Sequence, residues 1–233
     1  MIITKDNTIA EVVTDNIKTA DVFKKFNIDF CCGGGISIEK ACEKKGITAT
    51  ELLEKLATVS STNTPAKYNY KSWDMGFLID HSESIPILMQ YANKVANVHG
   101  HHYAEVIEIN DLFTEVAEEL KNHMVKEELV LFPYIKSMLE SEKTNSPLKS
   151  AHFGSVKNPV GMMEHEHEGA GDIFKRIAEI THQYTPPEGA CNTFRALYAK
   201  LDEFEQDLHH HIHLENNILH PKAIDLELKL RSI

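Results

Sequence analysis

The chain contains no run of 18 apolar residues and no basic start followed by an apolar stretch. Neither a membrane span nor a secretory signal is therefore expected, and the sequence predicts a cytoplasmic protein. The formal net charge of -11 comes without a compensating Lys/Arg cluster, which disfavours binding to nucleic acid or to an anionic membrane. Four cysteines, only two of them adjacent, do not form the framework of a small secreted scaffold, so reduced thiols are expected.

Strand-type alternation is also missing, and helical periodicity takes its place, so the predicted fold class is all-α. Residues 61–71 lack apolar periodicity and contain Pro65, which is typical of a linker. The sequence thus predicts a small helical domain over residues 1–60 and a larger one over residues 72–233.

Both domains are predicted from helix signals. In the first domain, Thr8 with Glu11 and Thr48 with Glu51 match the capping-box pattern. Short helices are expected there at 8–14, 17–26, 37–45 and 48–58. The second domain is expected to be an antiparallel four-helix bundle with long helices at 73–99, 102–141, 157–184 and 188–219.

Each long helix carries an apolar stripe spaced alternately three and four residues apart, the pattern that faces a bundle core. The stripes of the second and fourth helices include Val130, Tyr134 and Ile218 near their ends. The stripes are apolar except at a few His and Glu positions. Burying a glutamate without a partner costs several kcal/mol, so these positions need an explanation.

Histidine is abundant, with 14 residues against 24 Lys and Arg together. His123 and Glu127 are followed by Leu-Phe-Pro, and His211 and Glu215 are followed by Leu-His-Pro, so the motif is duplicated. Residues four apart lie on one helix face, so each His and Glu of a pair can chelate one ion.

The positions of these residues along the bundle axis give a second reason to expect a common site. His81 lies about 19 residues before the turn near Gly100 and His123 about 22 after it, which agree within about a turn at about 1.5 Å per residue. The second hairpin repeats this spacing around Pro186 and Pro187 to within about two turns. We expect six groups to converge at one end of the bundle: His81, His123, Glu127, His167, His211 and Glu215.

Four imidazoles and two carboxylates suit a pair of metal ions about 3.5–4 Å apart, with Glu127 and Glu215 as bridges. The absence of cysteine from the stripes disfavours a structural zinc site, and mixed His/carboxylate ligation suits iron or manganese. A lone core histidine is more often a hydrogen-bonded structural residue, but the duplicated pairs favour metal binding. His165, His209, His210 and His213 lie off the stripes and are expected to be solvated or to surround the ligands.

Cys31 and Cys32 precede three glycines and a helix that opens at Ser37. Backbone amides and the helix N-terminus can lower a thiol pKa, which would suit a redox or metal-handling role. The other interpretation is two small buried residues beside a turn that needs glycine.

Together these motifs resemble the iron-sulfur cluster repair di-iron proteins, also called repair of iron centres. These join a small cysteine-containing domain to a hemerythrin-like bundle, and the resemblance covers nearly the whole chain. It rests on the segments 29–34 (DFCCGG), 123–133 (HMVKEELVLFP), 166–171 (EHEGAG) and 211–219 (HIHLENNIL).

The resemblance implies iron ligands at His123, Glu127, His167, His211 and Glu215, and places the family's cysteine pair at Cys31 and Cys32. The family's first-helix ligand falls at Leu78, and His81, which the stripe selects independently, is the nearest replacement. His220 stands where the family usually has Phe.

The function implied by the resemblance is repair of iron-sulfur clusters damaged by oxidative or nitrosative stress, by donation of iron from an oxo- or hydroxo-bridged di-iron centre. The implied partners are damaged iron-sulfur proteins and a second copy of the chain. The alternatives are reversible binding of dioxygen or nitric oxide, as in hemerythrins, catalytic reduction of nitric oxide or peroxide, and a purely structural bundle. The cysteine-containing domain favours repair, because a simple oxygen carrier does not need one.

Overall fold

The computed structural model describes residues 2–60 and 73–232, and the side chains of residues 60–83 lie outside that description. The expected linker, 61–71, is among the residues left out. Contacts group the chain into two compact units, one made of Met1–Tyr70 and His209–Lys222 and the other of Lys71–Leu208 and Ala223–Ile233.

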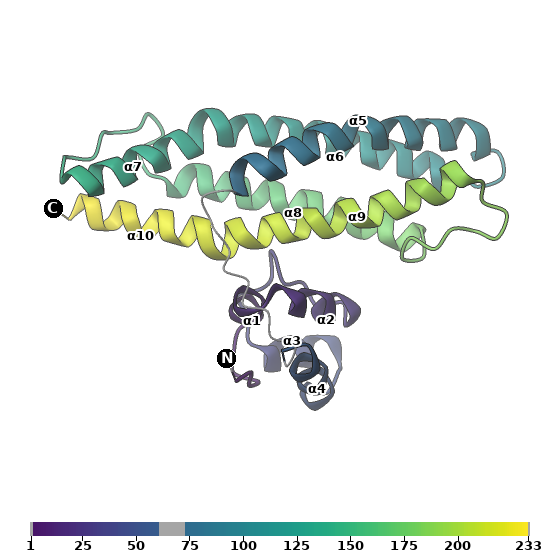
Figure 1. Ribbon diagram of the computed structural model, residues 1–233, viewed down its shortest axis with the longest axis horizontal. Coiled ribbons are helices and arrows are strands. Elements are labelled where there is room, and N and C mark those ends of the chain that lie inside the picture. The colour runs from purple at the N-terminus through teal and green to yellow at the C-terminus, as the bar shows by residue number, and fades with distance from the viewer. Residues whose placement is uncertain (1, 61–72, 233) are drawn as a thin grey trace. The chain divides into compact units, whose positions relative to one another are not determined.

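The first unit contains a group of short helices (Figure 1). Each lies within two residues of a predicted range, which is the usual uncertainty of a helix boundary. They are α1 (Ile9–Asp15), η1 (Ile17–Thr19), α2 (Ala20–Lys25), α3 (Ile38–Lys45) and α4 (Ala49–Ser60).

The capping box predicted at the start of α1 is confirmed. The Thr8 hydroxyl accepts a hydrogen bond from the Glu11 amide at 3.2 Å, and the Glu11 carboxylate accepts one from the Thr8 amide at 3.0 Å. Both bonds satisfy donors that a helix start leaves open. The apolar core beneath these helices consists of side chains at most 1% exposed, namely Ile9, Val12, Val13, Phe23, Ile38, Leu52 and Leu56.

The long helices follow the predicted order. They are α5 (Trp73–His99), α6 (Glu105–Lys126) with η2 (Glu127–Leu131) and α7 (Phe132–Thr144), α8 (Lys157–Ile180), and α9 (Asn192–Leu214) with η3 (Glu215–Leu219) and α10 (His220–Arg231). In the part of the chain that the structure describes there is no strand, only an isolated bridge between Thr8 and Ser37, so the all-α fold class is confirmed.

Three predicted helix boundaries are wrong by four residues or more. The helix predicted to begin at 188 begins at Asn192. The helix predicted to end at 184 ends at Ile180, because His182, Gln183 and Tyr184 all have positive φ angles, which a helix cannot contain. The helix predicted to end at 219 continues to Arg231.

Aromatic side chains show how the long helices of the second unit pack. The rings of Phe113 on α6, Phe174 on α8 and Phe204 on α9 lie with centroids 5.5–6.4 Å apart. Their helices run lengthwise beside one another (Figure 1). Offset and edge-on ring contacts of this kind add about 0.5–1.5 kcal/mol beyond the burial of apolar area.

The predicted stripes are largely buried. On α8 all six stripe positions are at most 2% exposed: Val160, Met163, His167, Ala170, Phe174 and Ile177. The stripes fail at Val130 and Ile218, which are half-buried, and the residue after Val130, Leu131, is fully buried. Among the described residues, no helix has the length and apolar character needed to cross a membrane.

Candidate metal centre

Each duplicated glutamate begins a π-helical turn. Glu127 is the first residue of η2, and Glu215 is the first residue of η3. The backbone N–H five residues later donates a hydrogen bond to the carbonyl of each glutamate. A proline follows closely in both cases, Pro133 and Pro221. Proline has no N–H and its ring clashes with the carbonyl four residues earlier, so a wider turn before it relieves the conflict. The extra residue shifts the buried stripe by one position, which explains the exchange of Val130 for Leu131.

In both motifs the histidine and the glutamate face each other. His123 Nε2 lies 3.3 Å from Glu127 Oε1, and His211 Nε2 lies 3.1 Å from Glu215 Oε2. The four-residue spacing of each pair therefore produces the geometry that the sequence predicts.

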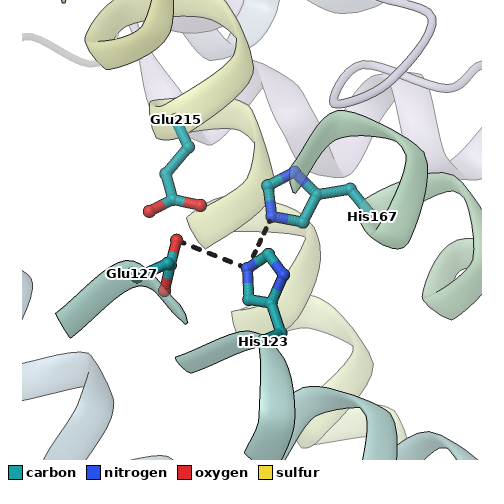
Figure 2. Close-up of side chains that lie close together, drawn as sticks. All are labelled: His123, Glu127, His167 and Glu215. Carbon is teal, nitrogen blue, oxygen red and sulfur yellow. Dashed lines mark hydrogen bonds and ion pairs between the residues drawn. The ribbon is translucent and has the colours of Figure 1, made fainter. Parts of the chain in front are cut away.

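Four of the six predicted ligands lie in one cluster. His123, Glu127, His167 and Glu215 each offer one ligand atom, and these atoms lie within 4.8 Å of one another. Figure 2 shows the imidazole rings of His123 and His167 next to each other, with the carboxylates of Glu127 and Glu215 to their left. The two Nε2 atoms are 3.1 Å apart.

The burial of this cluster favours a cation. The four residues are at most 3% exposed, although two of them are carboxylates. Two carboxylates brought together away from water repel each other, and their desolvation is costly unless a positive charge is bound between them. Imidazole nitrogens and carboxylate oxygens together form a donor set that suits iron, manganese or zinc. The residues present therefore fit a metal ion.

An acidic residue, Glu166, contacts the Nδ1 atom of His123. This Nδ1 lies 2.9 Å from Glu166 Oε2, and Glu166 also forms an ion pair with Lys126. Partial burial opposes ionisation of Glu166, but the hydrogen bonds from Lys126 and His123 outweigh it and lower the pKa of the carboxyl. The Nδ1–H therefore donates to a carboxylate, which leaves the Nε2 lone pair directed at the cluster. Glu166 lies in the segment 166–171, but neither the stripe nor the family resemblance predicts this role for it.

The other two predicted ligands, His211 and His81, are not among the four residues of this cluster. His211 contacts Glu215, and its side chain is 14% exposed, but it is outside the group of four. His81 lies in α5, but its side chain is outside the described residues. Both remain predictions as ligands.

The two adjacent cysteines lie in a tight loop, residues 29–34, which we call the cysteine loop. One carboxylate organises it: Asp29 accepts hydrogen bonds from the amides of Cys31 at 2.9 Å, Cys32 at 3.0 Å and Gly33 at 2.8 Å. Gly34 is required because an added Cβ would lie 2.5 Å from the Phe30 carbonyl oxygen.

The expectation that backbone amides lower a thiol pKa is wrong for Cys31. Its pKa is raised well above its ordinary value by the contact with Cys32, by burial and by the negative charge of Asp29. The physical reason is that the Asp29 carboxylate takes up the amide donors that would otherwise stabilise a thiolate.

His165 and His213, which lie off the stripes, differ in burial. His165 has a side chain that is 87% exposed, as predicted. His213 is not solvated: it is fully buried, its Nδ1 lies 3.2 Å from the Phe30 carbonyl oxygen, and its Nε2 lies 3.3 Å from Thr14. Burial is the main reason that its pKa falls to about 4. Its spacing carries no signal for this role, because its partners are about 180–200 residues away along the chain.

Comparison with known proteins agrees with this architecture. Residues 5–60 match a family described as a domain of unknown function (ScdA_N), and residues 80–223 match the hemerythrin HHE cation-binding domain. The iron-sulfur cluster repair protein YtfE of Pectobacterium carotovorum is 36% identical over 229 residues, which cover 94% of this chain and 97% of that protein. The corresponding protein ScdA of Staphylococcus haemolyticus is 31% identical, with 94% and 99% covered.

The chain belongs to the YtfE/ScdA family of iron-sulfur cluster repair proteins. A probable iron-sulfur cluster repair protein of Haemophilus influenzae is also similar, with 33% identity over 216 residues that cover 88% of this chain and 90% of that protein. The hemerythrin match includes all four residues of the buried His/Glu cluster. Family and geometry therefore both point to a metal site in this protein.

Proposed function

We propose that this protein repairs iron-sulfur clusters damaged by oxidative or nitrosative stress by giving them iron that it holds between its long helices. The observation that carries this proposal is the buried cluster of His123, Glu127, His167 and Glu215 in a chain of this family. In this proposal the iron is cargo, and the protein's own side chains hold it until a damaged cluster takes it.

The proposed cargo is two iron ions held by His81, His123, Glu127, His167, His211 and Glu215, with the two glutamates as bridges. The duplicated His/Glu pairs support this number, because each pair supplies a chelate for one ion. The ligand set consists of imidazole and carboxylate groups without thiolate. A labile set of this kind would suit a protein that must release its metal.

Metal content is the first measurement. Protein purified without oxygen is expected to contain about two irons per chain, and His81→Ala about one, since each ion needs its own terminal imidazole. His165→Ala is the matched control, because that side chain is exposed and lies off the stripe. Zinc in place of iron, or a metal-free protein, would contradict the proposal.

A repair assay tests the function itself. Iron-loaded protein is mixed with a nitric-oxide-damaged iron-sulfur enzyme, and the recovered activity is compared with that produced by the same concentration of free ferrous iron. Recovery above the free-iron level is expected from the parent protein and not from Glu127→Ala/Glu215→Ala. Equal recovery with free iron would refute donation.

Hemerythrin-like binding or reduction of dioxygen or nitric oxide is the second candidate, favoured by the match to the hemerythrin domain. Optical bands that appear with the gas while iron stays bound would identify a binding protein. Sustained turnover with an electron donor would identify an enzyme. Damaged iron-sulfur proteins as clients, and a homodimeric assembly, belong to the proposal for the repair role.

A further inference from the structure

The cysteine loop brings together three side chains that can bind metal. The ligand atoms of Asp29, Cys31 and Cys32 all lie within 4.8 Å of one another. Cys31 Sγ is 3.9 Å from Cys32 Sγ and 3.2 Å from Asp29 Oδ1. Two thiolates bound to one tetrahedral ion at about 2.3 Å have their sulfur atoms about 3.8 Å apart. The two sulfur atoms are thus already at the separation that chelation requires.

The loop is held in this conformation by contacts on two sides. Asp29 binds its amides from within, and residues of the 209–222 segment, which belongs to the same unit, bind it from the other side. Asn217 Nδ2 donates to the Cys31 carbonyl at 2.9 Å, and the His213 ring contacts the Phe30 carbonyl. A loop that is already ordered loses little entropy when it binds an ion.

Asp29, Cys31 and Cys32 differ in how far they are exposed to solvent. Cys31 is 5% exposed, Cys32 is half-buried and Asp29 is exposed, so an ion can reach the pair from solvent while one sulfur remains shielded. We propose that Asp29, Cys31 and Cys32 form a second metal site, which takes a thiophilic divalent cation such as iron(II) or zinc(II). Two thiolates and one carboxylate leave a fourth position of a tetrahedral ion open.

Binding is an exchange of an ion for protons, without oxidation or reduction. In the loop the Cys31 thiol can donate a hydrogen bond to Asp29 Oδ1, and the Sγ atoms of the two cysteines lie 3.9 Å apart. The cation displaces one proton from each thiol, and both protons leave to solvent. Because each thiol must lose its proton, binding weakens as the solution becomes more acidic.

This site differs in chemistry from the His/Glu cluster. Thiolates prefer softer ions than imidazole and carboxylate groups do, so the two sites can be told apart by their spectra. Use of the second site as a resting place for iron during repair rests on the proposed function, whereas the binding itself does not. A failed repair assay would therefore leave the metal-binding result standing.

The test is a cobalt(II) titration of the reduced, metal-free full-length chain without oxygen. Binding to thiolate produces a charge-transfer band in the near ultraviolet, which nitrogen and oxygen ligands do not produce. The band is expected in the parent protein and in Glu127→Ala/Glu215→Ala. It should fall by about half or more in Cys32→Ser, since at most one thiolate remains. It should disappear in Cys31→Ser/Cys32→Ser.

The matched control is Cys42→Ser. Cys42 is 3% exposed, and only burial raises its pKa. This variant should keep the full band. No band in the parent protein, a band that survives removal of both cysteines, or an equal loss in Cys42→Ser would each overturn the proposal. Because Cys32 is half-buried, Cys32→Ser should fold normally, and a far-ultraviolet circular dichroism spectrum checks this.

Discussion

Glu166 fixes which nitrogen of His123 faces the buried cluster. Its carboxylate accepts a hydrogen bond from the His123 Nδ1–H and forms an ion pair with Lys126. Partners of this kind hold a ligating imidazole in one orientation and one tautomer, and increase its basicity. The side chain thus acts on metal binding through His123, without needing to touch the metal.

Replacing Glu166 should therefore weaken metal binding. Glu166→Ala is expected to lower the affinity for iron(II) by about 10–100-fold, and Glu166→Gln by less, because the amide oxygen can still accept a hydrogen bond from the Nδ1–H. Competition with a chromophoric chelator measures the affinity. Glu168→Ala is the control, since that side chain is 68% exposed, and an equal loss in both variants would show that Glu166 has no special part.

At the scale of the elements, one buried carboxylate ties three helices together. Glu227 on α10 is 2% exposed and accepts hydrogen bonds from the Tyr134 hydroxyl on α7 at 2.9 Å and from the Val156 amide before α8 at 3.0 Å. Ser155 and Arg231 also contact it. Burial favours the neutral acid, but these donors together outweigh it and lower the pKa of Glu227.

Glu227→Gln should destabilise the protein by about 2–3 kcal/mol at neutral pH, because hydrogen bonds to a buried charge are lost. The folded-state pKa lies below the unfolded value of about 4.3, so this contribution is present above that pH and is lost as the pH falls through the folded-state pKa. The difference between parent and variant should therefore shrink in acid. Urea unfolding across a pH series measures it.

Glu142→Gln is the matched comparison. Glu142 pairs with Lys229, also on α10, at 2.6 Å, but both side chains are at least 40% exposed. Such an exposed pair contributes about 0–1 kcal/mol. If the two variants lost similar stability, the buried network would not be the cause.

For the whole molecule, the buried cluster couples metal binding to folding. Without metal, Glu127 and Glu215 bring two carboxylates into one water-poor space, which opposes folding. A cation bound there relieves this repulsion. It also stabilises the folded chain by about 2.7 kcal/mol when its concentration is a hundred times the dissociation constant.

Glu127→Gln should therefore raise the stability of the metal-free protein and reduce the stabilisation that metal binding gives. The metal-free variant should unfold at a higher temperature than the metal-free parent protein, and should gain less stability when iron(II) is added. Thermal unfolding followed by circular dichroism, with and without metal, tests both. Glu128→Gln, at the exposed neighbouring position, should behave like the parent. A metal-free Glu127→Gln less stable than the parent would contradict the repulsion.

Much of this architecture depends on features local in the sequence. The three-and-four spacing of apolar residues determines a helix face, and the four-residue spacing determines that His123 meets Glu127 and His211 meets Glu215. The capping box at Thr8 is equally local. The all-α class and the two His/Glu pairs could be predicted because each follows from a repeat distance along a single helix, whereas placing His167 beside them also needed the level of the residues along the bundle.

Other features were decided only by the tertiary structure. The π turn exchanges Val130 for Leu131 in the core, and the last helix continues past Pro221, because backbone hydrogen bonding there departs from the regular α pattern. His213 and Asn217 contact the cysteine loop, and the contact with Cys32, burial and the charge of Asp29 raise the pKa of Cys31, a thiol that backbone amides could otherwise have activated. Periodicity describes one helix at a time, whereas these contacts depend on which distant segments folding brings within hydrogen-bond distance.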